Sequence, residues 1–184
     1  MLQRYEIDAA TARLRVRTRA SGLLSRLAHD LEIAASTVTG HAHLDGDAWS
    51  ADLVVPTAGL RVVGALHGQE LDENALSAND RDQIERRLRD DVLAGKRAID
   101  VRASGSDRRS GVAAVTLDDR RQDGVALTLR VAVDAGTLTV SGSARVALSR
   151  LGVREVKGPL GAFRVADIIE VLWDLVLRDR KSVV

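Results

Sequence analysis

Several residue types are absent or scarce in this chain of 184 residues. It contains no cysteine, which excludes disulfide frameworks, thiolate metal sites and cysteine nucleophiles. Aromatic residues make up 2% of the chain, so the stacking platforms that bind single-stranded nucleic acid are lacking. The formal net charge is only +1, which offers little neutralisation of phosphates. We therefore expect no nucleic-acid partner.

Long hydrophobic runs are missing as well. No stretch is long enough to cross a bilayer, and the first residues do not place an apolar segment behind a basic start. These observations predict a cytoplasmic protein with no signal peptide and no stable membrane insertion. The length fits one domain with a sizeable core, so we expect a single domain over residues 1–184.

One stretch, residues 77–95, has a helical period. Its apolar positions recur every three to four residues and form one stripe: Ile84, Leu88, Val92 and Leu93. Ser77 or Asn79 suits the N-cap, and Gly95 is the residue type that ends helices. The pattern predicts an amphipathic helix over about 79–94. One such helix cannot bury its stripe alone, so it needs a sheet beside it.

Strand patterns dominate the rest of the chain. Asp45-Gly46 indicates a tight hairpin, and turns are predicted at 105–111, 118–124 and 134–136 between segments of alternating polarity. Strands joined by short turns run antiparallel, and one apolar face per strand indicates a closed barrel or a sandwich.

Three further segments are less regular. Residues 60–63 fit a short edge strand that could pair with a second copy and so form a homodimer, and residues 64–74 are predicted as a loop. Residues 165–178 fit a strand and a helix equally well.

Seven segments are similar, in order and spacing, to one known family. They are residues 5–8 (YEID), 24–30 (LSRLAHD), 80–85 (DRDQIE), 89–93 (RDDVL), 137–142 (TLTVSG), 148–153 (LSRLGV) and 158–167 (GPLGAFRVAD). Along nearly its full length the chain resembles the YceI-like family of lipid- or polyisoprenoid-binding, lipocalin-like proteins. The resemblance implies a mainly β fold: an extended eight-stranded antiparallel barrel with the helix near its mouth and a closing strand at 168–178. It also implies an elongated apolar cavity for an isoprenoid or another long-chain lipid.

The residues themselves favour a hollow barrel. An eight-stranded barrel is either filled by side chains or holds one small ligand, and several inward candidates are small: Ala51, Ala103, Gly142 and Ala144. A dry, packed core remains the alternative. The predicted ligand-binding residues are Leu14, Val16, Val38, Leu53, Val55, Leu127, Leu129, Val131, Val140, Val146 and Trp173, with Ile84, Leu88 and Val92 over one end. His29 is predicted as a polar anchor at the cavity mouth, with a structural hydrogen bond as the alternative.

Catalytic patterns are weak. His41 and His43 share one strand face at a spacing compatible with zinc, but a third ligand is not evident, and a solvent-facing pair is the simpler interpretation. Ser25 before His29 lacks the context of a hydrolase nucleophile. The alternating arginines of residues 13–19 indicate either a solvated outer face or an anion-binding row.

The sequence therefore predicts a non-enzymatic barrel that binds, stores or transports an apolar small molecule, an isoprenoid, quinone or fatty-acyl lipid, without a cofactor. A metal-dependent enzyme using His41 and His43, and a packed-barrel interaction module, are the alternatives.

Overall fold

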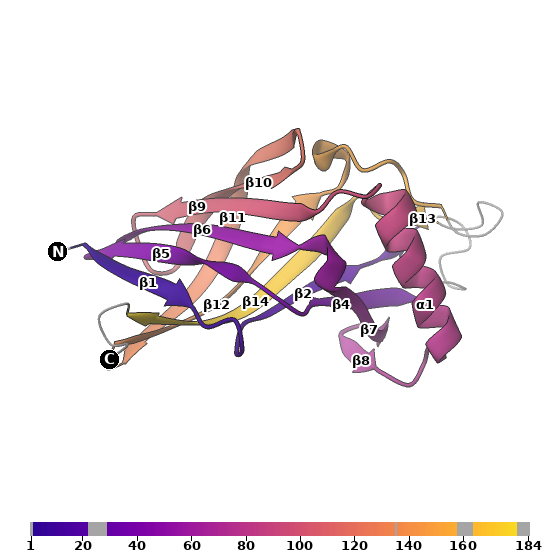
Figure 1. The fold of residues 1–184 in the computed structure, drawn as a ribbon, viewed down its shortest axis with the longest axis horizontal. Helices are drawn as coiled ribbons and strands as arrows, with labels where there is room; N and C mark the ends of the chain where they lie inside the picture. The colour runs from indigo at the N-terminus through magenta and orange to yellow at the C-terminus, as the bar shows by residue number, and fades with distance from the viewer. Residues whose placement is uncertain (1, 22–28, 135, 158–163, 180–184) are drawn as a thin grey trace.

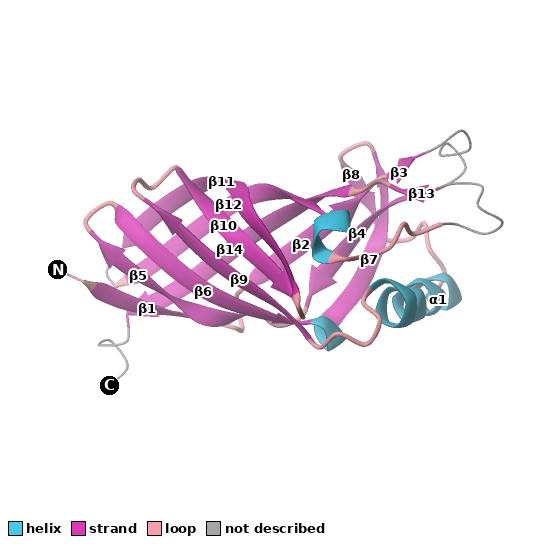
Figure 2. Cartoon of the chain, turned by 90° about the horizontal axis from the view of Figure 1, so that it is seen from above, coloured by secondary structure: helices cyan, strands magenta, loops and turns pink. Residues whose placement is uncertain are grey.

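A closed antiparallel barrel dominates the computed structural model, which describes residues 2–21, 29–134, 136–157 and 164–179. Within these ranges eight strands form a ring, because the last pairs with the first (Figures 1 and 2). In ring order they are β1 (Gln3–Ile7), β5 (Thr39–Asp45), β6 (Ala48–Pro56), β9 (Ala98–Gly105), β10 (Ser110–Leu117), β11 (Arg120–Asp134), β12 (Thr137–Ala147) and β14 (Ile168–Asp179). The predicted eight-stranded barrel and its closing strand are confirmed.

A second wall branches from β14. Residues 177–179 of β14 pair with β1, whereas residues 170–174 pair with β2. From there the sheet continues through the strands β2 (Arg13–Thr18), β4 (Asp30–Ala35), β7 (Leu60–His67) and β8 (Glu70–Asp72). The short strands β3 (Ala20–Ser21) and β13 (Arg164–Val165) form a separate pair. The wall therefore divides at β14, which pairs with β1 near its end and with β2 before it.

The two ends of the barrel carry different elements (Figure 1). We call one the hairpin end, because the turns between β5 and β6, β9 and β10, and β11 and β12 lie there together with the start of β1. We call the other the helix end, because the helix and β8 lie there, along with the one-turn helix η4 (Ser149–Leu151). A further one-turn helix, η2 (Thr57–Gly59), links β6 to β7.

The helix consists of α1 (Ala78–Arg87) followed by one π-helical turn, η3 (Leu88–Val92). Ser77 is the N-cap: its hydroxyl accepts from the Asp80 N–H, while the Asp80 carboxylate accepts from the Ser77 hydroxyl and backbone N–H. These hydrogen bonds lower the pKa of Asp80. At the other end Ala94 and Gly95 adopt positive φ angles of 49° and 75°, which terminates the helix. The predicted helix over about 79–94 is confirmed.

The helix covers a strand edge. The backbone N–H of Val62 in β7 donates to Glu85 Oε1 at 2.9 Å, so the helix satisfies an edge group that no strand pairs. The Arg81 guanidinium donates to the Glu73 carbonyl and fixes the approach to the helix. The helix therefore takes the place of a strand beside β7.

Two predicted boundaries are wrong. The loop predicted over 64–74 contains the end of β7 and all of β8, because Gly64 is a strand residue whose missing side chain lets the backbone of Asp72 and Glu73 approach closely. The turn predicted over 118–124 is only Asp118-Asp119, and residues 120–124 belong to β11. In both places polar or glycine residues were taken as breaks in a strand that continues.

Two arginines of β2, Arg15 and Arg17, are paired with carboxylates. Arg17 Nε lies 2.8 Å from Oε2 of Glu32, which is 2% exposed, and Arg15 donates to Asp174 at 3.0 Å. An ion-paired outer face accounts for this row, and a free anion-binding row does not.

Parts of the resemblance, residues 24–28 and 158–163, lie outside the described residues. Within the described ranges, no helix has the length and apolar character needed to span a bilayer.

Candidate ligand-binding cavity

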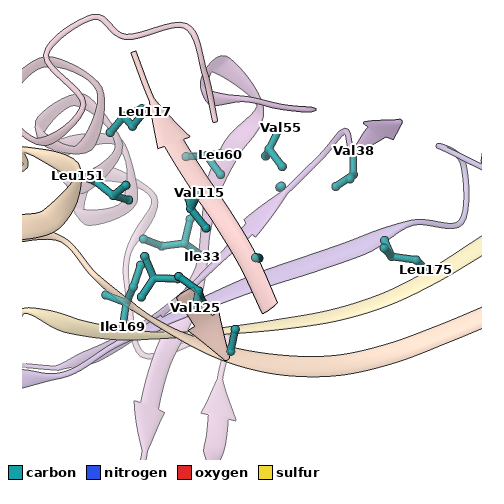
Figure 3. Close-up of a cluster of buried hydrophobic side chains, with 14 of the residues drawn as sticks. Ile33, Val38, Val55, Leu60, Val115, Leu117, Val125, Leu151, Ile169 and Leu175 are labelled. Carbon is teal, nitrogen blue, oxygen red and sulfur yellow. The ribbon is translucent and has the colours of Figure 1, made fainter. Parts of the chain in front are cut away.

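The barrel encloses a cavity of about 700 Å³. Its wall is formed by side chains of β2, β4, β5, β6, β7, β9, β10, β11, β12 and β14, with the helix over one end. Figure 3 shows a cluster of buried hydrophobic side chains, in which the lining residues Ile33, Val115 and Val125 lie close together, each from a different strand. Ligand pockets in proteins have volumes of about 300–1,000 Å³ and mostly apolar walls, and this cavity fits both criteria.

The hollow originates in a belt of small side chains. Ala42 of β5 is paired with Ala51 of β6, Ala51 with Ala103 of β9, and Ala103 with Ala113 of β10. All four line the cavity. Four neighbouring strands thus present only a methyl group at the same level, and the opposite wall does not fill the space.

Both tryptophans lie against glycines on the cavity wall. A Cβ at Gly142 would overlap the ring of Trp173, its cross-strand partner, and a Cβ at Gly105 or Gly111 would overlap the ring of Trp49. Trp49 Nε1 also donates to the Asp107 carbonyl at 2.7 Å. The indoles can therefore lie close to the wall instead of filling the interior.

Most predicted ligand-binding residues lie on this wall. The structure places fourteen of them there: Leu14, Val16, His29, Leu53, Val55, Ile84, Leu88, Val92, Leu127, Leu129, Val131, Val140, Val146 and Trp173. Val38 is the exception; it is 0% exposed but is not a lining residue. It lies in the link between β4 and β5, where strand alternation does not apply. Contact of any of these residues with a ligand remains a prediction.

The hairpin end is filled by large side chains. Tyr5, Leu138 and Leu177 come from β1, β12 and β14 and are at most 4% exposed. Arg108, in the turn after β9, is the one charged residue of the described lining at this end. This end forms a floor.

The helix end has a charged border that sequence reasoning missed. The additional lining residues there are Arg19, Arg87, Asp91, Arg154, Glu155 and Lys157. Strand alternation assigns Arg19 to the outer face with the arginines of β2, and nothing local indicates that residues 154–157 approach the helix. His29 lies at this border, and its ring contacts that of His67 with centroids 6.2 Å apart. The prediction that it lies near the mouth agrees with this placement.

The structure gives little support to a metal or catalytic site. The rings of His41 and His43 lie 5.3 Å apart, and His41 Nε2 is 3.7 Å from Asp52 Oδ2. Within the described residues, no group of three suitable side chains could hold a metal ion. Thr18 is the only hydroxyl of the described lining, and no hydrogen bond within that part of the chain links it to His29.

The architecture defines a class: an antiparallel barrel closed around one apolar cavity, as in lipocalin-type binding proteins. Neither a scan against protein-family models nor a search of curated proteins found a match. Solved structures do match. The crystal structure of Burkholderia cenocepacia BcnA has a TM-score of 0.65 at 15% identity, covering 92% of this chain and 98% of that one.

A polyisoprenoid-binding domain from Saccharophagus degradans, implicated in plant cell wall breakdown, has a TM-score of 0.62 at 10% identity. The match covers 95% of this chain and 98% of that domain. The chain therefore has a YceI-like fold, as the resemblance implied.

Proposed function

We propose that this protein is a non-enzymatic carrier that holds one long-chain apolar molecule, an isoprenoid, quinone or fatty-acyl lipid, inside its barrel. The observation that carries the proposal is the cavity of about 700 Å³ with its almost wholly aliphatic wall. The likeness to a domain described as polyisoprenoid-binding supports the same class of ligand.

Burial of the chain supplies the driving force. Each methylene removed from water contributes about 0.8 kcal/mol, so about twelve methylenes contribute roughly 10 kcal/mol. Association costs about 4–15 kcal/mol in lost freedom of motion, so a chain much shorter than this would bind weakly. The length of the apolar chain, more than any single polar contact, should therefore set the affinity.

The two rival functions are less well supported. A metal-dependent enzyme using His41 and His43 would need a third ligand, and within the described residues no group of three suitable side chains could hold a metal ion. A packed-barrel interaction module would need the interior filled, and the belt of alanines leaves it hollow.

Thermal unfolding with added ligand tests the proposal. A ligand at a hundredfold excess over its Kd stabilises the folded state by about 2.7 kcal/mol, which raises Tm by about 5–10 °C for a chain of this size. We expect such a shift with at least one of a fatty acid, an isoprenoid alcohol and a quinone. No shift with any of the three, on folded protein, would contradict the proposal.

A further inference from the structure

We propose that the bound molecule is an amphiphile with an acidic head, a carboxylate or a phosphate, and that four basic side chains at the helix end hold this head. We call Arg19, Arg87, Arg154 and Lys157 the basic rim. The inference rests on the proposed function and specifies the class of ligand and its orientation.

The basic rim borders the opening of the cavity. Its residues come from three segments: the link between β2 and β3, the end of α1 and the stretch that follows η4. All four line the cavity, yet the side chains of Arg19, Arg87 and Lys157 are 55%, 56% and 57% exposed. At the hairpin end Arg108 is the one charged lining residue of the described chain, and it is paired with Asp47 at 3.0 Å. The gathering of four basic lining residues therefore marks the helix end as the place where the cavity opens.

The ion pairs of the rim are loose enough for an anion to replace them. Arg19 lies 3.9 Å from the half-buried Asp30, Arg87 lies 3.8 Å from the exposed Asp91, and both arginines are solvent-exposed. Exposed pairs of this kind contribute about 0–1 kcal/mol.

On the other side of the rim, nearby carboxylates neutralise even less of the positive charge. Lys157 lies 3.4 Å from Glu155, but Glu155 is already bound by Arg164 at 2.6 Å. Arg154 has no ion pair within the described part of the chain. By contrast, the buried Glu32 holds Arg17 at 2.8 Å.

The excess of basic over acidic side chains at the opening indicates that the head group of the ligand is negatively charged. Four basic residues border the cavity at the helix end against two acidic ones, Asp91 and Glu155, although the whole chain has a net charge of only +1. Beyond the rim the wall is mostly aliphatic as far as the floor. An acidic amphiphile would therefore bind with its tail toward the hairpin end and its head at the rim.

Arginine side chains bind an acidic head group more tightly than a neutral one. Hydrogen bonds between guanidinium and carboxylate or phosphate are charge-assisted, often bidentate, and about twice as strong as neutral ones. An alcohol of the same chain length would keep the apolar contacts and lose this contribution.

The test compares ligands that share one chain and differ in the head: hexadecanoate, hexadecyl phosphate and hexadecanol, below their aggregation limits and at low ionic strength. We expect at least one of the two acids to bind about tenfold more tightly than the alcohol, and the advantage to shrink as salt is added. Which acid binds more tightly identifies the source of the head, a fatty acid or a phosphorylated lipid.

Charge variants complete the test. Arg154→Gln combined with Lys157→Gln should weaken binding of the preferred acid about tenfold and leave the alcohol unchanged. The matched control, Arg130→Gln combined with Arg145→Gln, removes two exposed arginines from the outer faces of β11 and β12 and should change neither. Equal affinity for acids and alcohol, or no effect of the rim variant, would overturn the inference while the proposed function stands. No binding of any of the three would overturn both.

Discussion

At the hairpin end strands meet through tight turns and large side chains fill the interior, whereas at the helix end the wall divides and charged side chains surround an opening. The hairpin end is built from regular antiparallel pairing, with Tyr5, Leu138 and Leu177 as a floor. At the helix end the second wall of β2, β4, β7 and β8 leaves the ring, and α1 lies beside β7.

This difference between the two ends shows how one barrel can be closed at one end and open at the other. Hydrogen bonding between neighbouring strands closes the hairpin end without help from other elements. At the helix end an edge of β7 is unpaired, and a helix can cover it through a side chain such as Glu85 while leaving room for a ligand. The cavity is therefore open to ligands at the irregular helix end.

The largest expected effect on ligand affinity comes from filling the belt of alanines above the floor. Ala51→Phe with Ala103→Phe should displace about four methylenes of a long chain, a loss of about 3 kcal/mol or roughly 100-fold in affinity. A chain shorter by the same amount should bind nearly as before, because only the hairpin end is blocked. Titrations with a long and a short fatty acid measure this.

The control for this prediction is Ala126→Phe, which adds the same bulk to an exposed position on β11 and should leave binding unchanged. If the inner variant instead loses about 1–3 kcal/mol of stability, as overpacked cores do, the interior is packed and not hollow.

The next effect concerns the second wall at the helix end. Arg17→Met leaves the buried Glu32 without its cation and should lower the free energy of unfolding by about 3–5 kcal/mol. Arg17→Met with Glu32→Met should recover most of the loss, because no buried charge remains unpaired. Urea denaturation of both variants decides this, and a single variant as stable as the parent would contradict it.

A smaller effect is expected at the hairpin end. Gly111→Ala places a Cβ against the ring of Trp49 and the Ser104 carbonyl, so the indole must move and about 1–3 kcal/mol of stability should be lost. In a Trp173→Phe background the emission of Trp49 should shift. Unchanged emission and stability would show that Trp49 does not lie against this glycine.

The smallest expected effect is on the pH dependence of stability, which involves one carboxylate at each end of the barrel. Hydrogen bonds from Ser77 lower the pKa of Asp80 at the helix end, and those from the Arg109 and Ser110 backbone N–H groups and the Ser110 hydroxyl lower that of Asp107 at the hairpin end. A lowered pKa means that each carboxylate stabilises the fold above its ordinary pKa of 3.8, and that this contribution is lost as pH falls through the folded value.

Ser77→Ala tests this contrast directly. Removing the cap should cost about 1 kcal/mol and raise the pKa of Asp80 toward its ordinary value, while the pKa of Asp107 stays low. Carboxyl titrations followed by NMR measure both groups in one sample. Equal changes in the two would contradict the assignment of the shift to Ser77.

The regular parts of the molecule could be predicted from the sequence. Alternation fixes the inward face of a strand, which is why residues such as Leu127, Leu129 and Val131 were expected on the cavity wall and lie there. The helix stands out because its apolar period and its capping residues agree. Periodicity could not assign the segment at 165–178, whereas the family resemblance implied a closing strand at 168–178, and β14 (Ile168–Asp179) confirms it.

The irregular parts could not be predicted. Val38 lies in a link where alternation has no meaning, and Gly64 continues a strand because another part of the backbone lies against it. The basic rim depends on segments far apart in sequence meeting at one opening, and no local pattern encodes that meeting. Sequence therefore specified the wall of the cavity much better than its mouth.

Native mass spectrometry of the protein mixed with a long-chain acid tests the hollow interior most directly. The account predicts one ligand bound to each chain, and its loss in the variant with Ala51→Phe and Ala103→Phe. Ligand-free protein alone, with excess ligand present and the fold intact, would contradict it.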